Sequence, residues 1–354
     1  MSEDLPAALV LVLESGIPAT RRNRIRSRLE ELGVTVTVVA GPDREYLEIR
    51  GDHLPVETLN PEAWDGVERM ISLAPEYPHA ARHTASTAAD RPSNSTVVHV
   101  GKVAIGGGTF TLIAGPCAVE SADQALRVAR AVAESGAVVL RAGVYKPRTS
   151  PYAFQGLQDA GLAILYEVKQ AVGMPVVTEV MDTGDIEKVA EVADMIQVGS
   201  RNMQNYALLR RLGRIRKPIL LKRGFAATLR EFLLAAEYIL SGGNDQIVLC
   251  ERGIRSSAGS GNVVLDLGAV PELRRRTHLP VIVDPSHGGQ DRGRVVPLAR
   301  AAVAVGADGL LVEVHDDPQR ALSDGQQALD PASFRAMVAQ VSAIRAALSG
   351  CDLV

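Results

Sequence analysis

Three cations stand close together where an apolar run of the sequence ends. Val138–Leu140 leads directly into Arg141, and Lys146 and Arg148 follow within the stretch LRAGVYKPRTSPYAFQG, residues 140–156. The whole chain has a formal net charge of -3, so these cations do not reflect a general excess of positive charge. A local positive field of this kind attracts a small anion. The stretch therefore predicts an anion-binding site.

Other cations also follow apolar, strand-like runs later in the chain. The planar guanidinium of arginine pairs with phosphate and carboxylate oxygens, and the ammonium of lysine adds a compact charge. Several such groups in one pocket indicate a polyanionic ligand or two phosphorylated ligands. The set is Arg141, Lys146, Arg148, Arg201, Lys222 and Arg252.

A second set of residues carries the donor atoms of a metal site. One thiolate, one imidazole and two carboxylates together suit Mn, Fe, Co or Zn better than Mg or Ca. These residues are Cys117, His287, Glu313 and Asp324. Each of them alone has an ordinary structural interpretation, so the metal prediction depends on their meeting in the fold.

The composition excludes several classes of protein. The 354 residues are 46% hydrophobic and 22% charged, as in a soluble globular protein. No run approaches the roughly 18 apolar residues of a membrane span, and the N-terminal MSEDLPAALVLV lacks the basic region of a secretory signal. The 3 cysteines have no CxxC spacing, which disfavours a disulfide framework. We expect a cytoplasmic protein that binds neither nucleic acid nor membrane.

The chain divides at a segment rich in serine, threonine and alanine. Residues 83–96, HTASTAADRPSNST, have no apolar period and are interpreted as a linker. Residues 1–82 predict strands over 8–14, 34–41 and 45–51 and helices over 19–33 and 62–73. This βαββα order is typical of a small α+β domain of ferredoxin-like type. Arg21, Arg22 and Arg24 are interpreted as the solvated face of its first helix.

From residue 97 to residue 354 the pattern changes. An apolar alternation about a glycine turn predicts a hairpin, and strand-like runs then alternate with helical ones. The strands are expected over 111–116, 138–143, 175–180, 195–200, 218–224, 247–253, 280–287 and 309–315. Their near-continuous apolar character indicates burial on both faces, which fits an α/β fold of the TIM (β/α)8 barrel type. A doubly wound sheet is the alternative, but IAGPCAVES is not the glycine-rich turn that such a sheet normally carries.

The barrel explains why ionic residues follow so many apolar runs. The carboxyl ends of barrel strands and the loops after them form the active face, so residues from distant parts of the chain meet there. Besides the two sets above, Glu179, Arg223, Glu251 and Asp284 hold such positions. The barrel therefore predicts that the cation set and the metal set share one site.

Seven motifs follow one another along the barrel segment: IAGPCAVES, LRAGVYKPRTSPYAFQG, QVGSRNMQN, LLKRGF, LCERGIR, VDPSHGG and VEVHDDPQRALSDGQQAL. Together they resemble the family of 3-deoxy-arabino-heptulosonate-phosphate (DAHP) synthases, the entry enzymes of the shikimate pathway, and most closely its type Iβ group. The resemblance spans about 97–345, and the order of the N-terminal elements resembles the ferredoxin-like regulatory domain of some members. KPRTS separates this family from the related octulosonate-phosphate synthases.

The resemblance implies roles for individual residues. It makes Cys117, His287, Glu313 and Asp324 the ligands of a divalent metal, without an organic cofactor. It assigns the phosphoenolpyruvate cradle to Arg141, Lys146, Arg201, Lys222 and Arg252. It places Pro147, Arg148 and Thr149 against erythrose 4-phosphate.

The implied reaction is a metal-dependent, aldol-type condensation of these two substrates to DAHP and phosphate. Lys146, His287 and Cys117 are the residues expected to take part in catalysis. The resemblance also implies an aromatic amino acid as effector of the first domain, a homo-oligomer, and a separate chorismate mutase as a partner.

Three alternatives stay open at this point. Lys222, next to Arg223 at a strand end, suits the Schiff-base lysine of a class I aldolase. An octulosonate-phosphate synthase would use a five-carbon aldose phosphate instead of erythrose 4-phosphate. A regulatory subunit that kept only the barrel would bind an effector without catalysing a reaction, but no carried-over position departs from the family motif.

Overall fold

The computed structural model describes residues 9–41, 43–50, 61–72, 76–82, 95–256 and 263–349. The chain forms two compact units, Met1–Pro78 and His79–Val354. The sequence prediction placed the first domain over 1–82 and the linker over 83–96. Most of that linker, residues 83–94, lies outside the described residues.

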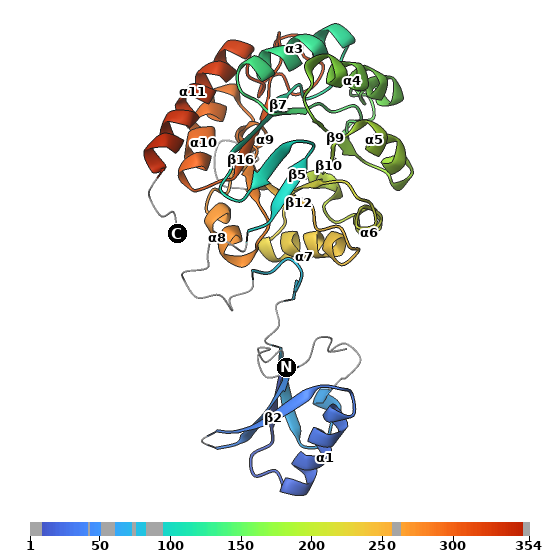
Figure 1. Ribbon diagram of the computed structural model, residues 1–354, viewed down its shortest axis with the longest axis vertical. Helices are drawn as coiled ribbons and strands as arrows, with labels where there is room; N and C mark the ends of the chain where they lie inside the picture. Colours follow the sequence, from blue (N-terminus) through green and yellow to red (C-terminus); the bar gives the residue numbers. More distant parts are fainter. Residues whose placement is uncertain are drawn as a thin grey trace. The chain divides into compact units, whose positions relative to one another are not determined.

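The first unit is an antiparallel sheet with a helix packed against it (Figure 1). Its described elements are β1 (Leu9–Leu13), α1 (Ala19–Glu30), β2 (Thr35–Ala40), β3 (Glu45–Arg50), a 3₁₀ turn (Pro61–Ala63) and β4 (Val67–Ser72). The sheet order is β2-β3-β1-β4. Leu9, Leu11 and Leu13 share one face of β1 and pack with Ile25 and Leu29, which are one helical turn apart on α1.

The predicted helix over 62–73 is wrong, because this segment contains the strand β4. Gly66 has a φ of +98°, a left-handed conformation that no α-helix interior accommodates. The chain turns there, and Val67–Ser72 then pairs antiparallel with β1. Strand pairing against an apolar core outweighs the helical spacing of the sequence, so the predicted βαββα order fails at its last element.

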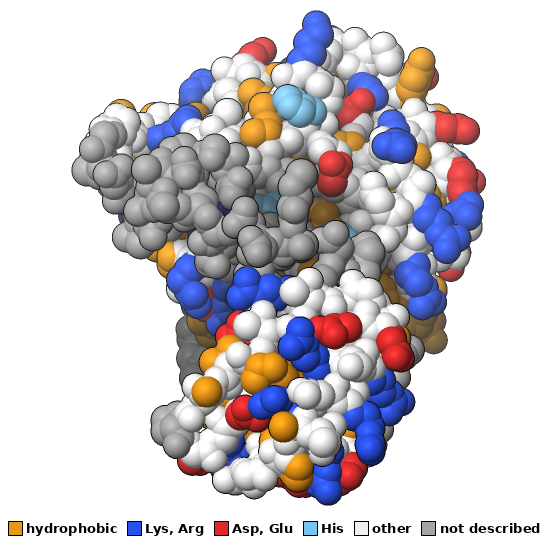
Figure 2. All heavy atoms as spheres, turned by 60° about the horizontal axis from the view of Figure 1, so that its bottom comes forward, with side chains coloured by type: hydrophobic (Ala, Val, Ile, Leu, Met, Phe, Trp, Pro, Cys, Tyr) orange, Lys and Arg blue, Asp and Glu red, His pale blue; other side chains and the backbone are white. Residues whose placement is uncertain are grey.

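The arginines of α1 lie on the solvated face, as expected. Arg21 pairs with Asp65 at 3.3 Å and Arg22 with Glu45 at 2.6 Å. Figure 2 shows basic and acidic side chains interspersed over the surface in view. Exposed pairs of this kind contribute little to stability, and nothing about them indicates a binding patch.

The second unit is a closed parallel barrel, as the sequence predicted (Figure 1). Its strands are β7 (Thr111–Gly115), β8 (Val139–Arg141), β9 (Val176–Val180), β10 (Met195–Val198), β11 (Ile219–Lys222), β12 (Ile247–Glu251), β15 (Val281–Val283) and β16 (Gly309–Glu313). The last strand pairs with the first, in the register Gly309 to Thr111 and Glu313 to Gly115. Each of the eight predicted strands is present, but the prediction over 280–287 was wrong at its end, because Pro285–His287 belong to the helix α9 (Pro285–Gly289), which begins at the proline.

Helices surround the barrel. They are α3 (Ala122–Glu134), α4 (Gln158–Val172), α5 (Ile186–Val192), α6 (Tyr206–Leu212), α7 (Leu229–Leu240), α8 (Ala269–Arg276), α10 (Arg292–Ala304) and α11 (Pro331–Leu348). Short elements occupy loops: 3₁₀ turns at Thr183–Asp185 and Ser200–Asn202, the strand pair β13 (Ile254–Arg255) and β14 (Val263–Val264), and the helix α9 (Pro285–Gly289). Side-chain caps start several helices, and α7 begins with a complete capping box of Thr228 and Glu231.

None of the helices in the described parts of the chain combines the length and the apolar character that crossing a membrane would require.

A hairpin, β5 (Val97–Val100) and β6 (Val103–Gly106), closes the amino-terminal end of the barrel. Val98, Val100 and Ile105 are fully buried in one cluster with the inward-facing side chains of the barrel strands. The hairpin also approaches Pro175 and Pro280, the residues that precede β9 and β15. The opposite end, where the strands finish, is therefore the end that can hold a site.

The start of the second unit is bonded to the outside of the barrel. The Glu237 carboxylate of α7 accepts hydrogen bonds from the backbone N–H groups of His79, at 3.1 Å, and Ala80, at 2.9 Å. Thr277 donates its hydroxyl proton to the Ala80 carbonyl, and the Arg82 N–H donates to the Arg276 carbonyl at 2.8 Å. Residues 79–82, which the prediction placed in the first domain, therefore belong with the barrel.

Candidate active site

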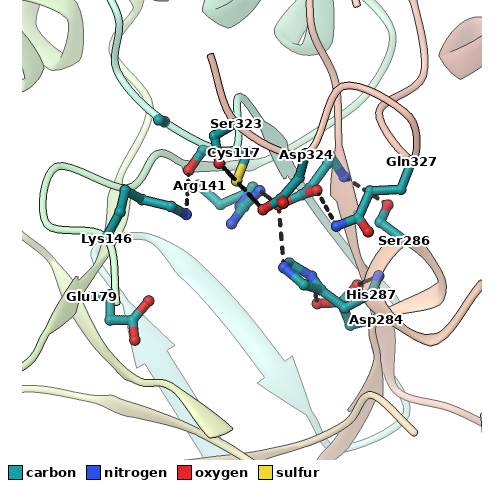
Figure 3. A network of polar contacts seen from close by, with 12 residues as sticks. Cys117, Arg141, Lys146, Glu179, Asp284, Ser286, His287, Ser323, Asp324 and Gln327 are labelled. Carbon is teal, nitrogen blue, oxygen red and sulfur yellow. Dashed lines mark hydrogen bonds and ion pairs between the residues drawn. The ribbon is translucent and has the colours of Figure 1, made fainter. Parts of the chain in front are cut away.

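Buried charges gather at the carboxyl ends of the barrel strands. Arg141 ends β8, Lys222 ends β11, Glu251 ends β12 and Glu313 ends β16. All four are less than one-tenth exposed, and burial of so many ionised groups requires close partners. Figure 3 shows how side chains from several of these strand ends and loops, among them Arg141, His287 and Asp324, lie around one space.

The structure brings the predicted metal set together. The ligand atoms of Cys117, Glu313 and Asp324 all lie within 4.8 Å of one another. Cys117 Sγ is 3.0 Å from Asp324 Oδ2, and His287 Nε2 is 3.4 Å from Glu313 Oε1 (Figure 3). The imidazole thus borders a compact cluster of one thiol and two carboxylates.

The chemistry of this cluster fits a divalent cation. Burial, together with the charge of Glu313, raises the pKa of the Cys117 thiol to about 12. Although burial alone would act in the opposite direction, the charges of His287, Arg141 and Lys146 hold the pKa of Glu313 well below its usual range. A divalent metal held here would replace the thiol proton and compensate the charge of the two carboxylates. The donor set is therefore suited to a transition metal.

Both oxygens of Glu313 are fixed from outside the cluster. Arg141 Nη1 donates to Oε1 at 2.7 Å, and Gln327 Nε2 donates to Oε2 at 2.7 Å. The backbone N–H of Glu313 donates to Ser286 Oγ at 3.0 Å. Gln327 and Ser286 were not predicted from the sequence, although Gln327 follows Asp324 by three residues in SDGQQAL. Such outer contacts orient ligand atoms as strictly as the ligands themselves.

Asp284 organises the other side of the site. It caps α9 by accepting from the His287 N–H at 2.8 Å, and its Oδ2 accepts from His287 Nδ1 at 2.7 Å. The same oxygen accepts a hydrogen bond from Lys222 Nζ. Burial opposes ionisation of Asp284, but His287 and Lys222 together hold its pKa well below the usual range. With Nδ1 engaged, Nε2 of His287 is the nitrogen turned toward Glu313.

Lys146 and Glu179 face the same space from a third side (Figure 3). Lys146 Nζ donates to the Cys117 carbonyl at 2.9 Å. Glu179 Oε2 accepts from Gln197 Nε2 at 3.1 Å, whereas its buried Oε1 has no hydrogen-bond partner among the described residues. A buried carboxylate oxygen without a partner is costly, which marks Oε1 as a contact for a ligand or water.

The remaining predicted arginines, Arg148, Arg201 and Arg252, differ in what they contact. Arg148 lies against the metal set, because its Nη1 is 3.6 Å from Asp324 Oδ1 and its Nη2 donates to Ser323 Oγ. Arg201 Nη2 donates to Thr149 Oγ1 at 3.4 Å. Arg252 is 4% exposed, and its Nε and Nη1 have no hydrogen-bond partner among the described residues. Cys250 is fully buried in the barrel core, as predicted, and Cys351 lies outside the described residues.

Comparisons with known proteins extend over both units. Residues 84–347 match the model of the DAHP synthetase I family. The chain is 44% identical over 340 residues to phospho-2-dehydro-3-deoxyheptonate aldolase of Thermotoga maritima, covering 96% of this chain and 98% of that protein. It is 36% identical over 271 residues to 2-dehydro-3-deoxyphosphooctonate aldolase of Syntrophotalea carbinolica, covering 71% of this chain and 96% of that protein.

Solved structures agree with the sequence comparisons. The crystal structure of the Thermotoga maritima DAHP synthase superimposes with a TM-score of 0.80 at 43% identity, covering 97% of this chain and 98% of that one. A truncated form of the synthase from the same organism gives a TM-score of 0.67 at 48% identity, covering 72% of this chain and 93% of that one.

Replacing Asp284 by Asn tests the buried pair at the centre of the site. The variant leaves the Lys222 ammonium buried without a carboxylate, and breaking a buried ion pair in this way costs about 3–5 kcal/mol. We expect the free energy of unfolding, measured in urea, to fall by that amount. The double variant Asp284→Asn/Lys222→Met leaves no uncompensated charge and should regain much of the loss. A double variant no more stable than Asp284→Asn would contradict this account.

Proposed function

Because the chain belongs to the DAHP synthetase I family, we propose that it condenses phosphoenolpyruvate with erythrose 4-phosphate, giving DAHP and inorganic phosphate. The observation that carries this function is the cluster of buried Cys117 and Glu313 with half-buried Asp324, beside a group of cations at the barrel mouth. The match over nearly the whole length of a heptonate aldolase favours this activity over octulosonate-phosphate synthesis.

Cys117, His287, Glu313 and Asp324 would hold the divalent metal, which is Mn, Fe, Co or Zn. When bound, the metal supplies a Lewis acid for the aldehyde oxygen of erythrose 4-phosphate. The chain itself fixes the ligand atoms: Arg141 and Gln327 hold Glu313, and Asp284 holds His287. Affinity for the metal therefore depends on residues beyond the four ligands.

Different cations of the site would bind the two substrates. Arg141, Lys146, Arg201, Lys222 and Arg252 would bind the phosphate and carboxylate of phosphoenolpyruvate. Pro147, Arg148 and Thr149 would contact erythrose 4-phosphate, and the approach of Arg148 to Asp324 supports a position for the aldehyde next to the metal set. Holding both reactants in one pocket lowers the entropic cost of their encounter.

The proton transfers of the reaction balance between two side chains. The vinyl carbon of phosphoenolpyruvate forms a bond to the aldehyde carbon, and Lys146 Nζ gives a proton to the resulting alkoxide. Water adds to the cationic carbon that is left, and Glu179 Oε1 takes the proton that this water loses. The adduct then collapses: its C–O bond to phosphate breaks, its hydroxyl proton passes to the departing phosphate, and the arginines stabilise the charge of that phosphate. The proton held by Glu179 then restores the Lys146 ammonium. Glu179 was not among the predicted catalytic residues.

Two alternatives from the sequence lose support. The ion pair of Lys222 with Asp284 engages the nitrogen that a Schiff base would need, so borohydride should not trap substrate on Lys222. A non-catalytic subunit would not need the two oxygens of Glu313 to be held by separate side chains.

For the first unit we propose a regulatory role of the type Iβ kind. Its antiparallel order β2-β3-β1-β4 supports a ferredoxin-like domain that would bind an aromatic amino acid and control access to the barrel. Such control requires two sites whose ligands each favour one of two states.

A comparison of aldehydes tests the proposed activity. We expect phosphate release from phosphoenolpyruvate with erythrose 4-phosphate, and at least about tenfold lower kcat/KM with arabinose 5-phosphate, because differences of one carbon in a fitted pocket are worth 1–3 kcal/mol. Both aldehydes are assayed with the same metal. Preference for the five-carbon sugar would overturn the assignment in favour of octulosonate-phosphate synthesis.

Truncation tests the regulatory proposal. Deleting residues 1–78 keeps His79–Arg82 bonded to the barrel, so activity should survive while inhibition by phenylalanine, tyrosine or tryptophan disappears. Deleting residues 1–95 removes those bonds as well and should lower the melting temperature of the barrel. If the 79–354 protein were still inhibited as strongly as the full chain, the effector site would lie in the barrel instead.

A further inference from the structure

Three guanidinium groups surround a single aromatic ring at the barrel mouth. The guanidinium carbons of Arg201, Arg252 and Arg255 lie 5.3, 4.6 and 4.8 Å from the centre of the Phe225 ring. Phe225 follows β11, Arg201 lies in the turn after β10, and the other two follow β12. The ring therefore joins the ends of three consecutive strands.

These three cations have no carboxylate partner in the described part of the chain. Within those residues, Arg201 donates to the Thr149 hydroxyl, and Nε and Nη1 of Arg252 are buried without a hydrogen bond. Arg223, two residues before Phe225, is different, because its Nη1 donates to Glu251 at 2.8 Å and to Asp266 at 3.0 Å. The protein thus neutralises Arg223 internally and leaves the other three guanidiniums for an external anion.

Three guanidinium groups this close repel one another, and the Phe225 ring offsets part of that repulsion. The face of an aromatic ring carries partial negative charge and attracts guanidinium groups within about 6 Å, most strongly when they are desolvated. Arg252 is such a group: burial, together with the charge of Arg201, lowers its pKa. A leucine of similar bulk would fill the space without this attraction.

The backbone also ties Arg255 to the ring. Its N–H donates to the Phe225 carbonyl at 2.6 Å, which fixes the start of the β13–β14 pair against the loop after β11. The Arg255 side chain is exposed at the mouth, and it is the one member of the three that the sequence analysis assigned no role.

We propose that Phe225 is a positioning residue that holds Arg201 and Arg252 for the phosphate of phosphoenolpyruvate, and that Arg255 is a third guanidinium binding the same phosphate. The inference rests on the proposed function for the identity of the ligand. The presence of a phosphate site on these three arginines does not depend on the proposed function.

The test compares Phe225→Leu, Phe225→Tyr and Arg255→Gln with a matched control. Phe110 also carries a stacked guanidinium, that of Arg345 at 5.4 Å, but it precedes β7 at the closed end of the barrel. Phe110→Leu therefore removes the same kind of contact away from the site. Steady-state kinetics with the metal present give kcat and a separate KM for each substrate.

We expect Phe225→Leu to raise the KM for phosphoenolpyruvate about tenfold, because it removes the partly desolvated contact of the ring with Arg252. We expect a rise of about tenfold for Arg255→Gln as well, because it removes a charged hydrogen-bond donor to the phosphate. The KM for erythrose 4-phosphate should stay unchanged, and Phe225→Tyr, which keeps the ring, should restore the wild-type value. Phe110→Leu should not change either KM. Unchanged KM values in Phe225→Leu and Arg255→Gln, or a rise for erythrose 4-phosphate alone, would overturn the proposal.

Inorganic phosphate separates failure of this inference from failure of the proposed function. Phosphate alone should raise the melting temperature of the wild type and of Phe110→Leu, and it should do so less for Arg255→Gln and Phe225→Leu. This difference would support the phosphate site even if the wild type formed no DAHP. Equal stabilisation of all four proteins would overturn it even if the wild type were active, and Arg255→Gln decides the matter should Phe225→Leu not fold.

Discussion

The burial of charge at the carboxyl ends of the barrel strands is the constraint on which the rest of the site depends. An ionised group in such a place is tolerated only if an opposite charge and further hydrogen bonds accompany it. Glu313 has Arg141 and Gln327, and Asp284 has Lys222 and His287. Arg141 ends β8 and Lys222 ends β11, whereas Glu313 ends β16 and Asp284 follows β15, so these two ion pairs also fix the relative positions of distant strand ends.

Buried polar atoms that lack such partners within the described residues indicate where a ligand would bind. Glu179 Oε1 and two nitrogens of Arg252 are buried and unpaired among the described residues, and the thiol of Cys117 lies between two carboxylates. These are the places where the fold leaves a charge for something else to complete. We propose a proton acceptor, an anion site and a metal site for these three places, and a condensation of two phosphorylated substrates uses all three.

The sequence predicted the barrel well because burial on both faces gives each strand a short apolar run, and the site residues follow those runs directly. The donor types of four such residues suggested the metal set, and the motif resemblance then matched the same four; the structure places Cys117, Glu313 and Asp324 together with His287 beside them. Gln327 and Ser286 were missed because a buried amide or hydroxyl has no spacing that distinguishes it from a solvated one. The helix predicted over 62–73 was wrong because the positive φ of Gly66 and the pairing of β4 with β1 are set by tertiary structure. The role proposed for Phe225 was likewise not predictable, because it depends on arginines that follow other strands.

The measurement that tests the central claim most directly is metal binding to the chelated protein, followed by phosphate release from both substrates. Mn, Co or Zn is returned to the wild type, to Cys117→Ser and to Cys250→Ala, which alters a thiol that is buried in the core away from the site. We predict that the wild type and Cys250→Ala lose activity on chelation and regain it, whereas Cys117→Ser binds the metal at least about tenfold more weakly and regains little. Full phosphate release by wild-type protein stripped of all metal, or equal metal affinity of Cys117→Ser, would contradict the account.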